Sequence, residues 1–111
     1  MTNTSDTLGE IEELVLLAIL RLGDDAYGVP IIREIAERAG RDVAPAAVYV
    51  ALRRLRHKQL VTARVSKPEP VQGGRARRYF NVTEAGVDLL AQSRHKMLRM
   101  WDGLHPMLEK R

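Results

Sequence analysis

The stretch from Pro45 to Asn81 changes from helical to strand-like periodicity, and this change restricts the possible folds more than any other feature of the chain. Val48, Leu52 and Leu55 recur at i, i+4 and i+7, which predicts a helix with one apolar face. Proline at its first position costs little, because the N–H that proline lacks would have no partner within the helix. We therefore expect a helix that begins at Pro45 and packs through a single face.

Two strand-like segments follow this helix. The first spans residues 60–65 and the second residues 75–82, and both contain the β-branched or aromatic residues typical of strands. Two prolines and two glycines between them exclude a continuing helix and indicate a long hairpin loop. Helix, strand, basic loop and strand in this order predict a winged helix. Its recognition helix suits a DNA major groove, and its charged wing suits the minor groove or the backbone.

The polar side of the predicted helix and the wing carry the candidate DNA contacts. On the helix, small side chains come first and arginines follow, so its start can enter a groove while guanidinium groups meet bases or phosphates. The candidate DNA-binding residues are Ala46, Tyr49, Val50, Arg53, Arg54, Arg75 and Arg77. On an extended strand Arg75 and Arg77 share one side, whereas Arg78 faces the other and can instead pair with an acid of its own domain.

A first helix is expected near the N-terminus. Thr7 and Glu10 have the spacing of a capping box, and Gly23 suits the left-handed position that follows a helix ending at Leu22. This helix is apolar on nearly every side, so it must be buried by more than one neighbour. In so short a chain, we expect a second subunit to cover part of it.

A second helix is expected over residues 26–39. Asp24 and Asp25 offer carboxylates for its N-terminal cap. Pro30 fits only in the first turn, so the helix begins between residues 25 and 28. The residues expected to face the core are Ile31, Ile35 and Ala39, and Gly40 ends the helix.

A long helix is expected after the hairpin, with Thr83 as its N-cap. Its apolar residues recur every seven positions, in two interleaved sets that Arg94 interrupts. Such a seam packs either on its own domain or on a second subunit, and the second alternative is favoured because three helices already supply the core. The residues predicted at the dimer interface are Leu14, Leu17, Leu90, Met97, Trp101 and Leu104.

Five segments in this order resemble the PadR family of bacterial transcriptional regulators, and the resemblance extends from about Leu8 onward. They are Leu14–Leu20, Ala26–Gly28, Val48–Leu55, Gly73–Phe80 and Val82–Gly86. The resemblance implies a dimeric DNA-binding regulator. In relatives, a tyrosine placed like Tyr49 donates a hydrogen bond from its hydroxyl to a phosphate. In this chain the ring of Tyr49 can instead border the core. Some PadR-like regulators sense phenolic or drug-like compounds, which makes Trp101 a candidate wall of an effector site as well as an interface residue.

Two positions depart from the family pattern. Gln59 stands where a glycine commonly ends the recognition helix, so it must either avoid positive φ or be strained into it. Ala44 replaces the usual serine or threonine cap, which costs the start of the recognition helix about 1 kcal/mol.

Charge is distributed unevenly along the 111 residues, whose formal net charge is +4 at pH 7. Residues 1–25 carry one arginine and six acids, residues 26–60 carry seven basic and three acidic groups, and residues 61–80 carry five and one. Positive charge therefore gathers on the recognition helix and wing, as expected for a polyanionic partner. Few aromatic residues are available to stack on unpaired bases, so double-stranded DNA is favoured over RNA.

Several classes of protein are excluded by the composition and spacing of reactive residues. The chain has no cysteine, its three histidines lack the spacing of metal ligands, and no catalytic triad, carboxylate pair or phosphate-binding loop is present. We expect neither an enzyme nor a cofactor. The N-terminus lacks a basic signal segment, and the apolar run over residues 14–20 is too short to span a bilayer, which predicts a cytoplasmic protein without a membrane partner.

The sequence thus predicts a mainly α fold with a small β-hairpin. Residues 1–82 would form a winged helix-turn-helix DNA-binding domain and residues 83–111 a dimerisation helix. The expected function is that of a homodimeric, ligand-responsive repressor on a pseudo-palindromic operator. The alternative is an adaptor that docks a protein through its N-terminal helix and has no specific DNA binding.

Overall fold

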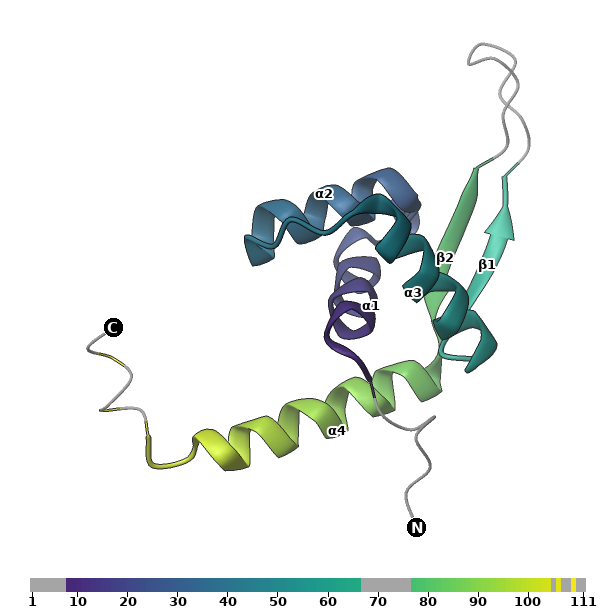
Figure 1. The fold of residues 1–111 in the computed structure, drawn as a ribbon. Coiled ribbons are helices and arrows are strands. Elements are labelled where there is room, and N and C mark those ends of the chain that lie inside the picture. The colour runs from purple at the N-terminus through teal and green to yellow at the C-terminus, as the bar shows by residue number, and fades with distance from the viewer. Residues whose placement is uncertain (1–7, 67–76, 105, 107–108, 110–111) are drawn as a thin grey trace.

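The computed structural model describes residues 8–66, 77–104, 106 and 109. Its elements in order are α1 (Glu10–Leu22), the 3₁₀ turn η2 (Gly23–Asp25), α2 (Gly28–Ala39), α3 (Pro45–His57), β1 (Val61–Val65), β2 (Arg78–Val82) and α4 (Glu84–Trp101). The two strands pair antiparallel, and their hairpin projects to one side of three packed helices while α4 crosses beneath them (Figure 1). The predicted winged-helix fold, mainly helical with a small hairpin and a long last helix, is confirmed.

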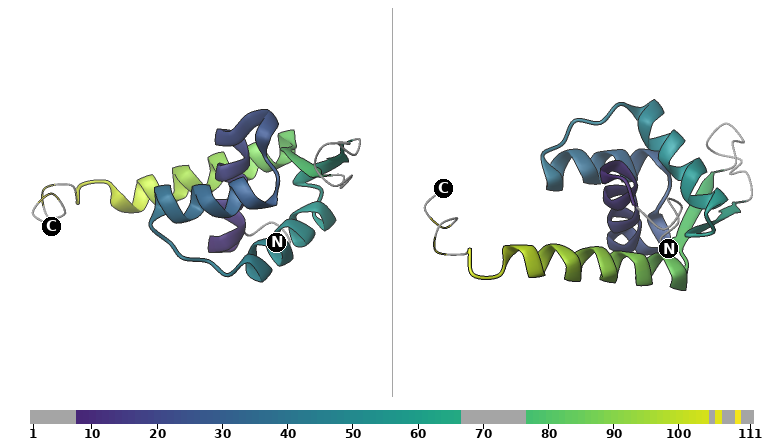
Figure 2. Two further views of the ribbon diagram at one scale, coloured as in Figure 1. Left: turned by 90° about the horizontal axis from the view of Figure 1, so that it is seen from above. Right: turned by 60° about the horizontal axis from the view of Figure 1, so that its bottom comes forward.

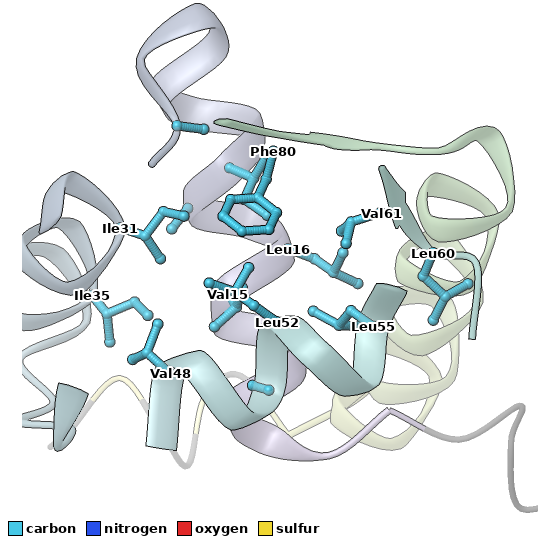
Figure 3. Close-up of a cluster of buried hydrophobic side chains, with 14 of the residues drawn as sticks. Val15, Leu16, Ile31, Ile35, Val48, Leu52, Leu55, Leu60, Val61 and Phe80 are labelled. Atoms are coloured by element: carbon cyan, nitrogen blue, oxygen red, sulfur yellow. The ribbon is translucent and has the colours of Figure 1, made fainter. Parts of the chain in front are cut away.

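The hydrophobic core forms around α1. Figure 3 shows side chains from α2, α3 and the hairpin meeting around Val15 and Leu16, both of which are fully buried. The core positions predicted on α2 and α3 are confirmed, namely Ile31, Ile35, Val48, Leu52 and Leu55. The prediction for Ala39 is wrong, because this last residue of α2 lies beyond the core and is exposed.

The start of α1 differs from the predicted capping box. Thr7 lies outside the described residues, and the helix begins at Glu10 with Gly9 as its N-cap. The backbone N–H of Gly9 donates to Oε1 of Glu12 at 2.8 Å, while Oε2 of the same carboxylate accepts from Nζ of Lys58 at 2.8 Å. Glu12 therefore has the role predicted for Glu10, and it also joins α1 to the end of α3.

The start of α2 also differs from the predicted cap. Asp24 and Asp25 form the turn η2, and the N-cap of α2 is Tyr27, with an extended backbone. The physical reason is a long-range hydrogen bond, in which the N–H of Phe80 in β2 donates to the carbonyl of Ala26 at 2.8 Å. This contact keeps the chain extended beside the hairpin, so the helix begins only at Gly28. Its predicted end is confirmed, since Gly40 adopts the left-handed conformation.

The junction between α3, the hairpin and α4 is held by hydrogen bonds to Thr83. Its side chain donates to the carbonyl of Gln59 at 2.9 Å and accepts from the N–H of Gly86 at 3.1 Å, which confirms the predicted N-cap of α4. Its backbone N–H donates to the carbonyl of Leu60 at 2.9 Å. Gln59 has φ +63°, so it is strained into the left-handed region rather than avoiding it. The contacts to Thr83 offset this strain by fixing the turn.

Gly86 lets α4 approach this turn closely, and its replacement by alanine should destabilise the protein. A Cβ there would lie 2.5 Å from the carbonyl oxygen of Leu60 and 2.7 Å from Cγ1 of Val82. Neither atom can move away easily, because the oxygen of Leu60 belongs to the backbone and Val82 belongs to β2, the strand that leads into α4. We expect Gly86→Ala to lower the free energy of unfolding by about 1–3 kcal/mol, despite the better helix propensity of alanine. Urea denaturation followed by circular dichroism measures this change.

The matched control is Gly28→Ala, which also adds a methyl group in the first turn of a helix. The three atoms nearest to its Cβ would all belong to the ring end of Tyr49, a side chain that is half exposed and can turn away. We expect the free energy of unfolding to change by less than about 1 kcal/mol. Equal destabilisation by the two substitutions would contradict the importance of the Leu60 carbonyl.

Helix α4 packs on α1 near its middle and ends two residues before Gly103. Oγ of Ser93 donates to the carboxylate of Glu13 in α1, with distances of 3.2 Å to Oε1 and 3.1 Å to Oε2. The helix ends at Trp101, and Gly103 has φ +82°. Figure 2 shows the C-terminal end of α4 extending past the other helices, so this part has no neighbouring element within the described residues.

Candidate nucleic-acid interface

The outer face of α3 is exposed where the sequence placed DNA contacts. Its inner face is buried in the core, and the 100° rotation per residue turns the remaining positions to solvent. The predicted contacts on this helix are all exposed, namely Ala46, Tyr49, Val50, Arg53 and Arg54. The structure divides them between two sides of the helix rather than gathering them in one place.

One side of α3 borders the start of α1. Ala46, Val50 and Arg54 follow each other at intervals of four residues, so they form one stripe. They line a shallow hollow together with Glu10 and Glu12 of α1. This side therefore combines small side chains and one arginine with nearby carboxylates.

The other side of α3 borders a positively charged cleft between the start of α2, α3 and β2. The cleft has a volume of about 420 Å³. The side chains that determine its chemistry are Tyr27, Tyr49, Arg53, Arg56, Arg77 and Arg78. Four guanidinium groups and no carboxylate line it, so it favours an anion. Arg56 was not identified as a candidate from the sequence, although its spacing of three from Arg53 could have revealed it.

Tyr49 lies at the rim of this cleft and not within the core. It is 47% exposed, and its hydroxyl lies directly over Gly28, where a Cβ would overlap it. The first N–H groups of α2 lie in the same region and have no partner within the helix. A hydroxyl donor beside a helix N-terminus suits a phosphate oxygen, and that contact stays a prediction.

The wing arginines lie at the base of the hairpin, as far as the structure describes them. Arg75 lies outside the described residues. The N–H of Arg77 donates to Oγ of Ser66 at 2.9 Å, and its carbonyl accepts from the N–H of Ser66 at 2.8 Å, which extends the hairpin by one pair beyond Val65 and Arg78. Arg78 is exposed and lines the cleft, and none of the ion pairs among the described residues includes it.

Two tyrosines lie side by side next to the hairpin, and an arginine stacks on each of them. The guanidinium of Arg64 lies 4.5 Å from the ring centroid of Tyr79, and that of Arg77 lies 4.5 Å from the ring centroid of Tyr27. The two rings meet edge to face, with centroids 5.4 Å apart. Both distances to the cations are within the range of cation–π attraction. Sequence reasoning missed both tyrosines as site residues. Tyr27 contacts Tyr79 and Arg77, which follow it about fifty residues later in the chain.

The predicted dimer-interface residues have different surroundings. Met97 and Trp101 are 48% and 41% exposed on the projecting part of α4, and Leu17 of α1 and Leu104 are exposed to a similar degree. Leu14 is partly buried. Leu90 is only 8% exposed and belongs to the core of its own protomer, so it has little surface to offer a partner. Exposed apolar side chains at other positions of these helices include Leu20, Leu98 and Met100.

Metal and membrane sites are not found in the part of the chain that the structure describes. Within residues 8–66 and 77–104, no group of three or more histidine, aspartate or glutamate side chains could hold a metal ion. No helix of those ranges is both long enough and apolar enough to cross a bilayer.

Comparisons with known proteins identify the family and the fold. The description "Transcriptional regulator PadR-like family" applies to the sequence family that matches residues 16–92. Among proteins of curated function, none matches the chain. A PadR family transcription regulator from Clostridium difficile is 24% identical over 92% of this chain and 97% of its own, with a TM-score of 0.69. One from Eggerthella lenta is 24% identical over 88% and 83%, with a TM-score of 0.66. A transcriptional regulator from Clostridium thermocellum is 16% identical over 97% and 99%, with a TM-score of 0.71.

Proposed function

This chain belongs to the PadR-like family of transcriptional regulators, and from that premise we propose that it binds double-stranded DNA sequence-specifically as a homodimer and represses transcription. The members of this family are transcriptional regulators and not enzymes. The observation that carries the proposal is the cleft beside α3. Four guanidinium groups line it, and an exposed helix face adjoins it.

The cleft and the exposed face of α3 would have different roles in DNA recognition. Arg53, Arg56 and Arg77 would neutralise backbone phosphates beside the groove, which gives affinity and register. The stripe of Ala46, Val50 and Arg54 would enter the major groove, where small side chains permit close approach and a guanidinium can bind a guanine edge. Carboxylates beside the stripe would disfavour phosphates there.

Dimerisation is supported by the apolar side chains that the protomer leaves uncovered on α4 and α1. Met97, Trp101 and Leu17 are each more than two-fifths exposed, which is costly for a lone subunit. Pairing through these helices would place two copies of α3 on one face of a duplex, about one helical turn apart. The operator is therefore proposed to be pseudo-palindromic.

Trp101 is also proposed as the wall of an effector site between subunits. Its ring is partly exposed near the end of α4, where a planar apolar ligand could insert and change the angle between the subunits. Release from DNA would follow, because the two α3 helices would no longer match the spacing of the half-sites. Operator affinity measured with a series of planar aromatic compounds tests this, and no shift with any of them would count against an effector.

The test of DNA binding uses duplexes enriched by the wild-type protein from a random-sequence pool. Arg53→Ala and Arg56→Ala each remove one guanidinium from the cleft of each protomer, and we expect each to weaken binding about tenfold or more in a dimer. Fluorescence anisotropy with the enriched duplex measures the affinity. Arg99→Ala is the charge-matched control, because Arg99 is exposed on α4, outside the predicted seam and away from the cleft, and it should change affinity by less than about twofold.

The alternative function is that of a protein-binding adaptor, in which the exposed residues of α1 dock a partner and the basic surface meets acidic side chains. An adaptor would enrich no duplex from the random-sequence pool. Loss of specific duplex binding in the Arg53 and Arg56 variants, with an intact dimer, would favour the regulator.

A further inference from the structure

The stacking of Arg77 on Tyr27 joins the base of the hairpin to the start of α2. Arg77 lies just before β2, at the edge of the described part of the hairpin, and its guanidinium lies 4.5 Å from the Tyr27 ring centroid. Both residues also line the positively charged cleft. The base of the wing therefore meets the first turn of α2 at the place where an anion would enter.

Tyr27 does not belong to the buried core. The core cluster contains neither Tyr27 nor Tyr79, and the Tyr27 ring is only partly buried. Its backbone caps α2 through a carbonyl that accepts from the N–H of Ile31 at 3.1 Å, which any side chain at this position would allow. The ring itself is thus available for a role other than packing.

A ring beneath an arginine limits the conformations of a long, otherwise flexible side chain. The tyrosine face attracts the guanidinium, while the N–H groups at the edge of the guanidinium can still donate to an oxyanion. The arginine side chain then loses its conformational entropy before the anion binds. Binding therefore costs less free energy and is stronger. The edge-to-face contact with Tyr79 supports the Tyr27 ring from its other side, and Arg64 stacks on Tyr79 in turn.

We propose that Tyr27 is a positioning residue for DNA binding: its ring holds the Arg77 guanidinium at the cleft so that it contacts one backbone phosphate in each half-site. The proposal rests on the DNA-binding function proposed above and adds a residue to it. Tyr27 itself does not touch the DNA. It acts through Arg77, so the effect of replacing it should depend on the presence of that arginine.

The experiment is a double-mutant cycle with Tyr27→Leu, Arg77→Ala and the double variant, measured on the enriched duplex over a range of salt concentrations. We expect each single substitution to weaken binding about fivefold to twentyfold in a dimer with two such pairs. The double variant should be no weaker than Arg77→Ala alone. Tyr27→Phe keeps the ring and should bind like the wild type.

The salt dependence separates positioning from a general loss of structure. Each lost phosphate contact lowers the slope of log affinity against log salt by roughly 0.9, so Arg77→Ala and Tyr27→Leu should each lower it by about 1.8 per dimer. The positioning role would be overturned if the losses of binding free energy from the two single substitutions added up in the double variant. It would also be overturned if Tyr27→Leu left the slope of log affinity against log salt unchanged. A wild-type protein that enriches no duplex would instead refute the proposed function.

A spectroscopic measurement keeps the proposal testable if Tyr27→Leu does not fold. In the wild type, the ring current of Tyr27 should shift the Arg77 side-chain proton signals upfield, and this shift should persist when the enriched duplex is added. Loss of the shift in the complex would show that the guanidinium leaves the ring on binding, and the proposal would be wrong.

Discussion

Raising the salt concentration from 50 to 200 mM should weaken binding of the dimer to its DNA site by a factor on the order of 10³–10⁵. This range corresponds to roughly six to ten phosphates neutralised per dimer. Each protomer offers four guanidinium groups in the cleft beside α3, so a dimer offers eight. Binding releases the cations condensed on these phosphates, and added salt opposes that release.

Isothermal titration of the enriched duplex at several salt concentrations measures this slope. Arg53→Ala should reduce the slope, because it removes one phosphate contact from each half-site, whereas Arg99→Ala on α4 should leave it unchanged. The outcome that contradicts the prediction is tight, specific binding with almost no dependence on salt. Such binding would mean that the cleft arginines do not meet phosphates.

Replacing both Met97 and Trp101 by glutamate should convert the dimer into monomers and weaken operator binding by at least about 100-fold. Both side chains are about half exposed in the lone protomer, so the substitutions should leave its own core intact. In a dimer, the same positions would bury four carboxylates against apolar surface, which is strongly unfavourable. A monomer binds each half-site separately and loses the advantage of linked sites.

Sedimentation velocity measures the subunit state, and circular dichroism checks that the variant remains folded. Gln92→Glu is the matched control, because it adds a carboxylate to the exposed surface of the same helix at a position outside the predicted seam. We expect this control to remain dimeric. A wild type that sediments as a monomer at all concentrations would contradict the prediction, and so would a Met97/Trp101 variant that stays dimeric.

Local chemistry explains why most element boundaries could be predicted. Gly23, Gly40 and Thr83 each determine a helix end through contacts or conformations within a few residues of it. These helix ends could therefore be predicted from the sequence. The same holds for the core face of α3, where a period of 3.6 residues separates buried from exposed side chains. The strain at Gln59 was anticipated as one of two outcomes for the same reason.

Errors and omissions occurred where a residue's role depends on a segment far away in the sequence. Asp24 and Asp25 had suitable chemistry for a cap, but the hydrogen bond between Phe80 and Ala26 delayed the helix beyond their reach. Leu90 fitted the heptad pattern, but it is buried in the core cluster of its own protomer.

The sequence by itself determined the order and type of the elements, the winged-helix class and the positive charge on α3 and the hairpin, because periodicity, turn residues and charge are local properties of the chain. Only the tertiary structure decided which side chains share a site. It separated Arg54 from Arg53 on α3 and brought Arg53 beside Arg77 and Tyr27, since packing around α1 sets the distances between elements that sequence spacing does not specify.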